Sequence, residues 1–96
     1  MRRRFIVTYD IADPGRLRKV FSLMRGFGES IQYSVFMCEL SSKEKTILVT
    51  SLHEAINHNE DRIMIIDIGS IEIEVSERIE FIGKAMEITS RECIII

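Results

Sequence analysis

The chain has 96 residues, of which 46% are hydrophobic and 29% are charged, and its formal net charge is −2. This length provides for a single domain, residues 1–96, and the composition excludes a disordered chain. The slightly negative charge excludes a uniformly basic nucleic-acid-binding protein. No run of about 20 apolar residues is present, so we expect no membrane-spanning segment.

The cysteines and the basic N-terminal residues indicate the cellular compartment. Cys38 and Cys93 are far apart in the sequence and form no CxxC motif. This pattern is typical of thiols in a reducing cytoplasm rather than of a disulfide framework or a metal site. The apolar run that follows the first arginines, from Phe5 to Tyr9, is too short for a signal peptide. We therefore expect a cytoplasmic protein.

Charge is distributed unevenly along the chain. Residues 1–25 carry seven Arg or Lys and two Asp, a local charge of +5, whereas residues 72–92 carry six Glu and three Arg or Lys, a local charge of −3. Such asymmetry is typical of a face that binds a polyanion. The alternative is a solvated surface on which charges happen to cluster.

The N-terminal stretch from Arg2 to Asp10 combines three arginines, an apolar run and a carboxylate. Its aromatic and β-branched residues predict a strand, and since neither face is clearly polar, a central strand covered on both sides. Asp10 would lie where this strand leaves the sheet, a position at which functional sites are often built. Its carboxylate can hold a metal ion or act as a base, and the arginines can hold phosphate.

Two helices are predicted further along. The first begins at Asp13-Pro14-Gly15, where Asp13 can cap the free amides and Pro14 suits the first helical position, and it ends at residues 26–28. The second begins after Ser41, which fits a capping box with Glu44, and runs to about residue 57. Apolar residues recur at helical spacing in both segments.

The remaining apolar segments predict strands. We expect strands at residues 31–40 and 62–68, the latter central because it is apolar on both faces, followed by a turn at Gly69-Ser70. Residues 71–82 fit both a strand and a helix, and β-branching favours a strand at 77–82. Three exposed isoleucines at the end, residues 94–96, would forfeit about 1.5–3 kcal/mol each. We therefore predict an edge strand over residues 91–96 that pairs with a second subunit.

The order of these elements predicts the fold class. It is βαββαβ if residues 31–40 bend into two strands, and βαβαββ if they do not. The simplest match is an α+β, ferredoxin-like sandwich, in which an antiparallel sheet carries two helices on one face. The C-terminal residues would add an extra edge strand.

The chain has an apolar strand that ends in Tyr9-Asp10, a first helix rich in Arg and Lys, and a Gln-x-Ser-Val-Phe strand at residues 32–36. In this order and spacing the motifs resemble the CRISPR-associated protein 2 family. Asp61-Arg62-Ile63 and Phe81-Ile82-Gly83 stand where the family has its third strand and a late glycine. The resemblance spans nearly the whole chain and rests on the order and spacing of the motifs.

The resemblance implies a ferredoxin-like fold and a homodimer with its sheets face to face, in a prokaryotic cytoplasm. It implies a role in CRISPR adaptation, the acquisition of new spacers, in which the dimer bridges the CRISPR integrase and binds double-stranded DNA. Members are also described as metal-dependent endonucleases, so single-stranded RNA is a further candidate partner. The alternative is a metal-dependent endoribonuclease toxin of the virulence-associated type, which shares the fold.

Site residues follow from the charge pattern and the resemblance together. The resemblance assigns the metal-associated, catalytic aspartate to Asp10 and a supporting role to Tyr9. One carboxylate is too few to fix Mg²⁺ or Mn²⁺ tightly, so we expect one ion per dimer between paired Asp10 residues. The candidate nucleic-acid-binding residues are Arg2, Arg3, Arg4, Arg16, Arg18, Lys19, Arg25, Ser34 and Phe36.

Each assignment has a structural alternative. Asp10 can be a turn residue that accepts hydrogen bonds from the following amides. The basic residues of the first helix can form an ordinary solvated face. Tyr9 and Phe36 can stack on bases, but aromatic residues in strands are usually buried, so the core is favoured for both. Ser34 can be a small interior residue.

Overall fold

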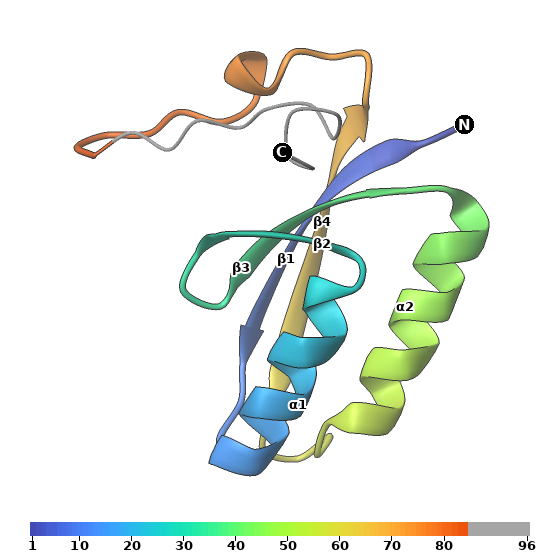
Figure 1. Cartoon of the computed structure of the whole chain (residues 1–96), viewed down its shortest axis with the longest axis vertical. Helices are drawn as coiled ribbons and strands as arrows, with labels where there is room; N and C mark the ends of the chain where they lie inside the picture. Colours follow the sequence, from blue (N-terminus) through green and yellow to red (C-terminus); the bar gives the residue numbers. More distant parts are fainter. Residues whose placement is uncertain (85–96) are drawn as a thin grey trace.

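A computed structural model describes residues 1–84, which form a four-stranded sheet covered by two helices on one face (Figure 1). The elements are β1 (Arg3–Asp10), α1 (Pro14–Arg25), β2 (Gly28–Gln32), β3 (Val35–Leu40), α2 (Ser42–Ala55) and β4 (Arg62–Ser70). All strand pairs are antiparallel, in the order β2-β3-β1-β4. This order and the βαββαβ sequence of elements confirm the predicted ferredoxin-like α+β fold.

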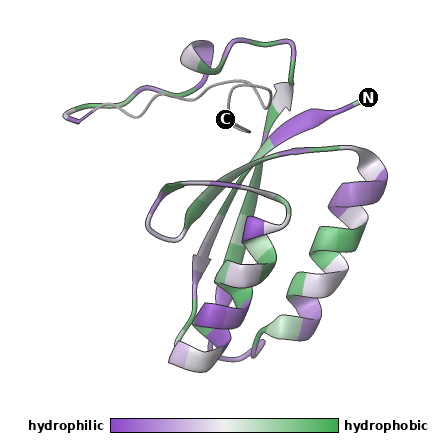
Figure 2. Cartoon of the chain, viewed as in Figure 1, coloured by the Kyte–Doolittle hydropathy of each residue, from purple (hydrophilic) through white to green (hydrophobic). Residues whose placement is uncertain are grey.

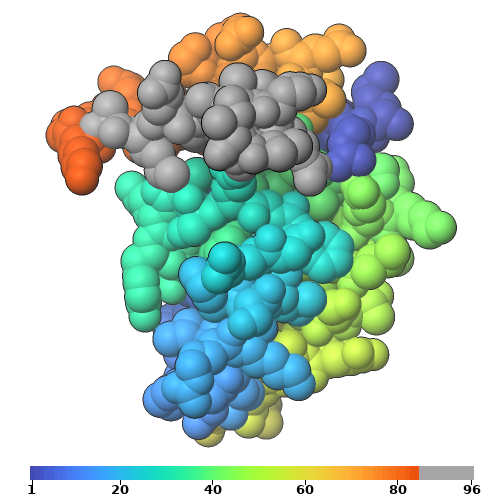
Figure 3. All heavy atoms as spheres, viewed as in Figure 1, coloured from blue at the N-terminus to red at the C-terminus, as the bar shows by residue number. Residues whose placement is uncertain are grey.

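The core lies between the helices and one face of the sheet. Alternate residues of β1 (Phe5, Val7 and Tyr9) are buried against α1 and α2, which contribute the buried Val20 and Leu48 among others. Figure 3 shows α1 and α2 side by side on the near side of the molecule, next to the β2–β3 hairpin. Figure 2 shows hydrophilic residues on the outer turns of α1 and at the start of β1. The β1 residues between these buried ones point to the opposite side of the sheet, which the helices do not cover. We call this side the open face.

Both helix starts confirm the predicted caps. The Asp13 side chain accepts a hydrogen bond from the Arg16 amide at 2.9 Å, and Pro14 begins α1. Ser41 and Glu44 form the capping box of α2, with the Ser41 amide donating to Glu44 Oε1 at 2.8 Å. These caps satisfy amides that have no partner within the helix. They define the starts of α1 and α2 through hydrogen bonds between residues that are close in the sequence.

Residues 31–40 are not one strand. The chain turns at Tyr33-Ser34, and β2 and β3 pair as a hairpin in which Gln32 lies opposite Val35. Ser34 has a φ of 61°, an unusual conformation for a residue other than glycine. The turn was hard to predict because neither Tyr33 nor Ser34 is a glycine or an asparagine, the residues that usually mark such a turn.

Three predictions about the second half of the chain were wrong. Within residues 1–84, β4 is an edge strand rather than a central one, and it includes Gly69-Ser70, which pair with Arg4 and Arg3 instead of forming a turn. No strand forms at residues 77–82 among the described residues; Val75–Glu77 form a 3-10 helix instead. The alternation of apolar residues there had also fitted a helix. The predicted edge strand at residues 91–96 lies outside the described residues.

Candidate nucleic-acid and metal site

Asp10 ends β1 on the open face of the sheet. Phe5, Val7 and Tyr9 are buried on the helix face, so the alternation along the strand directs Asp10 to the other side, where it is exposed. Its cross-strand neighbour on β4 is Arg62. Within residues 1–84 no hydrogen bond or ion pair occupies the Asp10 carboxylate. The carboxylate is therefore available to a ligand.

Apolar side chains lie beside Asp10 on the same open face. The register pairs Ile6 with Ile66 and Thr8 with Met64, so these residues share the face with Asp10. Met64 is 52% exposed and Ile66 is 40% exposed. Exposed apolar side chains on adjacent strands are typical of a surface that is covered in an assembly. We call Ile6, Met64 and Ile66 the open-face patch.

Asp61 holds the loop that follows Asp10. Its side chain is fully buried and accepts the Ala12 amide on Oδ1 at 2.9 Å and the Asn57 amide on Oδ2 at 2.8 Å. Arg16 Nε donates to Asp61 Oδ2 at 2.7 Å, and Arg16 Nη2 donates to Oδ1 at 3.2 Å. Asp61 thus joins the β1–α1 loop, α1 and the α2–β4 loop. It takes the amide-binding role that the alternative interpretation gave to Asp10.

The ion pair of Asp61 and Arg16 changes the titration of both groups. Hydrogen bonds from Arg16 hold the pKa of the Asp61 carboxyl well below its ordinary value, and the same bonds raise the pKa of the guanidinium. Arg16 Nη2 also donates to Glu60 Oε1 at 3.0 Å. Arg16, which was predicted to bind nucleic acid, therefore uses two of its nitrogens to bind acidic side chains of this chain.

The N-terminal arginines are also engaged. Arg2 Nη1 lies 2.8 Å from Glu44 Oε1, Arg3 Nε lies 3.0 Å from Asp67 Oδ2, and Arg4 Nε lies 3.4 Å from Glu39 Oε2. Arg4 Nη1 further donates to the Ile73 carbonyl at 2.6 Å. These contacts tie the start of β1 to β3, α2, β4 and the segment after β4. These contacts leave fewer guanidinium nitrogens of the three arginines free to bind phosphate.

The remaining basic residues lie on α1. Arg18, Lys19 and Arg25 are exposed, and none forms an ion pair with an acidic side chain in the part of the chain that the structure describes. The Arg25 guanidinium lies over the Phe21 ring, 5.9 Å from its centroid. Of the predicted phosphate contacts, these three keep their charge uncompensated by a nearby carboxylate.

The aromatic candidates lie in the core. Phe36 is completely buried, with its ring centroid 6.2 Å from that of Tyr9 and 5.6 Å from that of Phe21. Burial raises the pKa of the Tyr9 hydroxyl. Ser34 is half-buried, and its carbonyl accepts the Tyr9 amide at 3.1 Å. The structure thus places Tyr9 and Phe36 where the core alternative put them, and Phe36 has no surface from which to contact a nucleic acid in this subunit.

Sequence reasoning missed Asp61 as a functional position. The residue was noted only as part of a motif, Asp61-Arg62-Ile63. Its role depends on Ala12 and Arg16, which are more than 40 positions away in the sequence. Within residues 1–84 no group of three or more His, Cys, Asp or Glu side chains could hold a metal ion. A metal at Asp10 therefore needs ligands from outside this set.

Comparison with known proteins identifies relatives over most of the chain. The family CRISPR associated protein Cas2 matches residues 1–74. CRISPR-associated endoribonuclease Cas2 1 of Rhodospirillum rubrum is 38% identical over 92 residues, covering 96% of this chain and 89% of the relative. CRISPR-associated endoribonuclease Cas2 of Geobacter sulfurreducens is 35% identical over 96 residues, the whole length of both.

Solved structures share the fold. The Streptococcus pyogenes Cas2 crystal structure aligns with a TM-score of 0.72 and 29% identity, covering 83% of this chain and 99% of that one. A hypothetical protein from Thermus thermophilus, TT1823, aligns with a TM-score of 0.77 and 26% identity, covering 88% and 94%. No helix among residues 1–84 has the length and apolar character needed to cross a membrane.

Proposed function

Because this chain belongs to the CRISPR-associated Cas2 family, we propose that it acts in CRISPR adaptation as a homodimer that bridges the integrase and binds double-stranded DNA. We further propose that paired Asp10 residues give the dimer Mg²⁺-dependent endonuclease activity. The family match carries the first proposal, and the position of Asp10, exposed at the end of β1 on the same face as the open-face patch, carries the second. The family match does not favour the alternative of a virulence-associated toxin.

The open-face patch supports a face-to-face dimer. Ile6, Met64 and Ile66 lie side by side on β1 and β4, and the two helices cover only the other face. Full burial of side chains of this size is worth about 1.5–3 kcal/mol each. In a dimer with two-fold symmetry the same patch meets itself, so both copies of Asp10 approach the same interface.

Asp10 fits the donor chemistry of a hard divalent cation. Its oxygens are exposed and unoccupied by any side chain or amide in residues 1–84, and carboxylate oxygens are preferred by Mg²⁺ and Mn²⁺. When bound, such a cation supplies charge to polarise a phosphoryl group and activate a water molecule. The two Asp10 carboxylates would hold the ion, and Asp61 would keep the following loop in place. The names of the curated relatives support RNA as one substrate.

Binding to duplex DNA is assigned to α1. Arg18, Lys19 and Arg25 are exposed and have no acidic partner among the described residues. Phosphate contacts of this kind give affinity without reading the base sequence, and they weaken as salt rises. The expected binding is therefore insensitive to sequence and falls steeply between low and moderate ionic strength.

The catalytic part is tested with Asp10→Asn. We expect Mg²⁺-dependent cleavage of single-stranded RNA to fall by about 100-fold or more, since this variant loses the charge of both metal-binding carboxylates. Glu54→Gln, at an exposed carboxylate of α2, is the matched control and should cleave like the wild type. Cleavage by Asp10→Asn at the wild-type rate would rule out the catalytic role.

The dimer is tested with Ile66→Glu, measured by light scattering. We expect the wild type to be dimeric and this variant to be monomeric, because two-fold symmetry brings its added charges into the same interface. Ile47→Glu, on the exposed surface of α2, is the control because Ile47 has a similar exposure. A monomeric Ile66→Glu protein that still cleaves RNA normally would refute the shared Asp10 site.

The adaptation role is tested by spacer integration with the cognate integrase. Integration should require this protein and should be lost with Ile66→Glu. Asp10→Asn is assayed in parallel, and equal integration by Asp10→Asn and the wild type would show that the nuclease chemistry is dispensable for this role. Undiminished integration when the protein is omitted would contradict the bridging proposal.

A further inference from the structure

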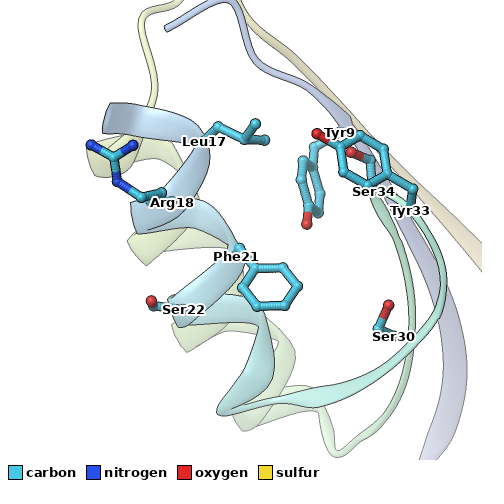
Figure 4. Close-up of a pocket in the computed structure, with 8 residues that line it drawn as sticks. All are labelled: Tyr9, Leu17, Arg18, Phe21, Ser22, Ser30, Tyr33 and Ser34. Carbon is cyan, nitrogen blue, oxygen red and sulfur yellow. The ribbon is translucent and has the colours of Figure 1, made fainter. Parts of the chain in front are cut away.

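A pocket of about 410 Å³ lies between α1 and the β2–β3 hairpin, on the helix side of the sheet (Figure 4). Its volume is within the range of small-molecule sites. Phe21 from α1 faces Tyr9 across the pocket, and Tyr33 and Ser30 come from the hairpin. The residues that line this pocket are separate from the site at Asp10, which lies on the other face of the sheet.

The walls of the pocket are aromatic and unusually exposed. Phe21 is 41% exposed, and its inner edge rests on Phe36 with a centroid distance of 5.6 Å. Tyr33 lies in the turn, next to Ser34 with its positive φ, and is 84% exposed. An aromatic ring that remains exposed to water contributes little to the stability of the hydrophobic core. Exposed rings on two sides of a pocket provide surfaces on which a planar ligand can stack.

The polar groups of the pocket are hydroxyls. Tyr9 lies on its inner side, and Ser22, Ser30 and Ser34 also line it. The Tyr9 hydroxyl, a group that is protonated near neutral pH and whose pKa burial raises further, can donate a hydrogen bond. Hydroxyls can both donate and accept, which suits the mixed donor and acceptor edge of a nucleobase. No acidic residue lines the pocket.

Basic side chains of α1 lie near the pocket and favour a ligand that carries phosphate outside it. Arg18 contributes to the lining, and Figure 4 shows its guanidinium on the outer side of α1, pointing away from Tyr9 and Tyr33. Arg25 lies on the same helix, with its guanidinium 5.9 Å from the centroid of the Phe21 ring, and has no acidic partner in residues 1–84. Positive charge thus lies outside the pocket while aromatic and hydroxyl groups lie inside. A nucleotide has the same division between its phosphate and its base.

We propose that this pocket holds one unpaired base of a single-stranded RNA, with the adjoining phosphates on the basic face of α1. Stacking on Phe21 and Tyr33 would bind the base, and the hydroxyls would orient it. A base within a duplex is stacked between its neighbours and cannot enter. The hairpin turn and Asp10 lie at the same end of the sheet, since the Tyr9 amide bonds the Ser34 carbonyl. The pocket would therefore hold the strand at the end of the sheet that carries Asp10, on the opposite face, and this proposal rests on the single-stranded RNA cleavage proposed above for that residue.

The test measures binding by fluorescence anisotropy, in EDTA so that no cleavage occurs. Tyr33→Ala removes a largely exposed ring and should weaken binding of a single-stranded RNA oligonucleotide by about 5- to 150-fold, the range for loss of one stacked base. Ile47→Ala, on α2, is the control and should bind like the wild type. A duplex of the same sequence should bind Tyr33→Ala and the wild type equally.

An abasic oligonucleotide gives the second arm. Wild-type affinity should fall when bases are removed from the strand, and Tyr33→Ala should lose little further affinity on the same substrate. A 2-aminopurine base in the strand should be quenched on binding to the wild type and less so by Phe21→Leu, which keeps the apolar wall but removes the ring. Equal affinity of the wild type and Tyr33→Ala for the normal strand would overturn the proposal.

Failure of the pocket and failure of the nuclease give different results. If the pocket is wrong but Asp10 is catalytic, Tyr33→Ala binds and cleaves like the wild type, while Asp10→Asn does not cleave. If Asp10 is not catalytic but the pocket binds a base, Asp10→Asn cleaves normally and base-dependent binding in EDTA remains.

Discussion

Replacing Phe36 with alanine should destabilise the protein strongly without directly removing a nucleic-acid contact. The ring is completely buried and lies against Tyr9 and Phe21. Truncating a buried phenylalanine to alanine costs about 3–5 kcal/mol, and each lost aromatic pair adds to the cost of lost area. A chain of 96 residues has a total free energy of unfolding of roughly 5–14 kcal/mol. The substitution therefore removes a large part of that stability.

The expected result is a fall in melting temperature of about 12 °C or more, since 1 kcal/mol corresponds to roughly 4–8 °C in a domain of this size. Differential scanning calorimetry at one fixed protein concentration measures it, because the stability of a dimer depends on concentration. Phe36→Leu keeps an apolar side chain and should melt closer to the wild type.

Binding by Phe36→Leu separates the two roles considered for this residue. If Phe36 only packs the core, Phe36→Leu should bind duplex DNA like the wild type at a temperature where both are folded. A loss of more than about 10-fold in affinity, equivalent to 1.4 kcal/mol, with an unchanged melting temperature would refute the core assignment. An unchanged melting temperature in Phe36→Ala would refute the packing argument.

Three further predictions concern positions outside the open face. Arg16 depresses the pKa of Asp61 in the folded state, so Asp61 contributes its full stability above its ordinary pKa of 3.8, and this contribution declines as pH falls from 3.8 towards the depressed folded-state pKa. Asp61→Asn should therefore lower the melting temperature at pH 7, and the deficit should shrink steadily as pH is lowered below 3.8; a deficit that stays constant over that range would refute this. Burial raises the pKa of the Cys38 thiol to about 12. In a Cys93→Ser protein, a thiol reagent should therefore modify Cys38 only after the protein unfolds, and rapid modification of the folded protein would contradict this prediction. In Gly28→Ala the new Cβ would lie 2.3 Å from the Met37 carbonyl oxygen, so denaturant unfolding should show a large loss of stability. Gly26→Ala is the control and should be close to neutral in stability, because the nearest contact of its Cβ would be at 3.4 Å. Equal stability of the two variants would refute the clash.

Part of the candidate site could be predicted from the sequence because it depends on local alternation. Once Phe5, Val7 and Tyr9 are assigned to the buried face of a strand, Asp10 must share the opposite face. The motif order also gave the family, which the comparisons confirmed. The turn at Tyr33-Ser34 escaped prediction because a residue other than glycine adopts the positive φ there.

Long-range contacts decided the roles of the charged residues. The sequence showed a group of basic residues near the N-terminus but not which of them have acidic partners. Arg3 meets Asp67 and Arg16 meets Asp61, pairs separated by 64 and 45 positions, so only the packed sheet brings them together.

The sequence by itself determined where the two helices begin, which β1 residues share a face and where Asp10 lies, because caps and alternation depend on neighbours along the chain. The tertiary structure decided that β4 is an edge within residues 1–84, that Asp61 secures the loop beyond Asp10, and that a pocket opens beside Tyr33. These features depend on strand order and on contacts between distant segments, which no local pattern specifies.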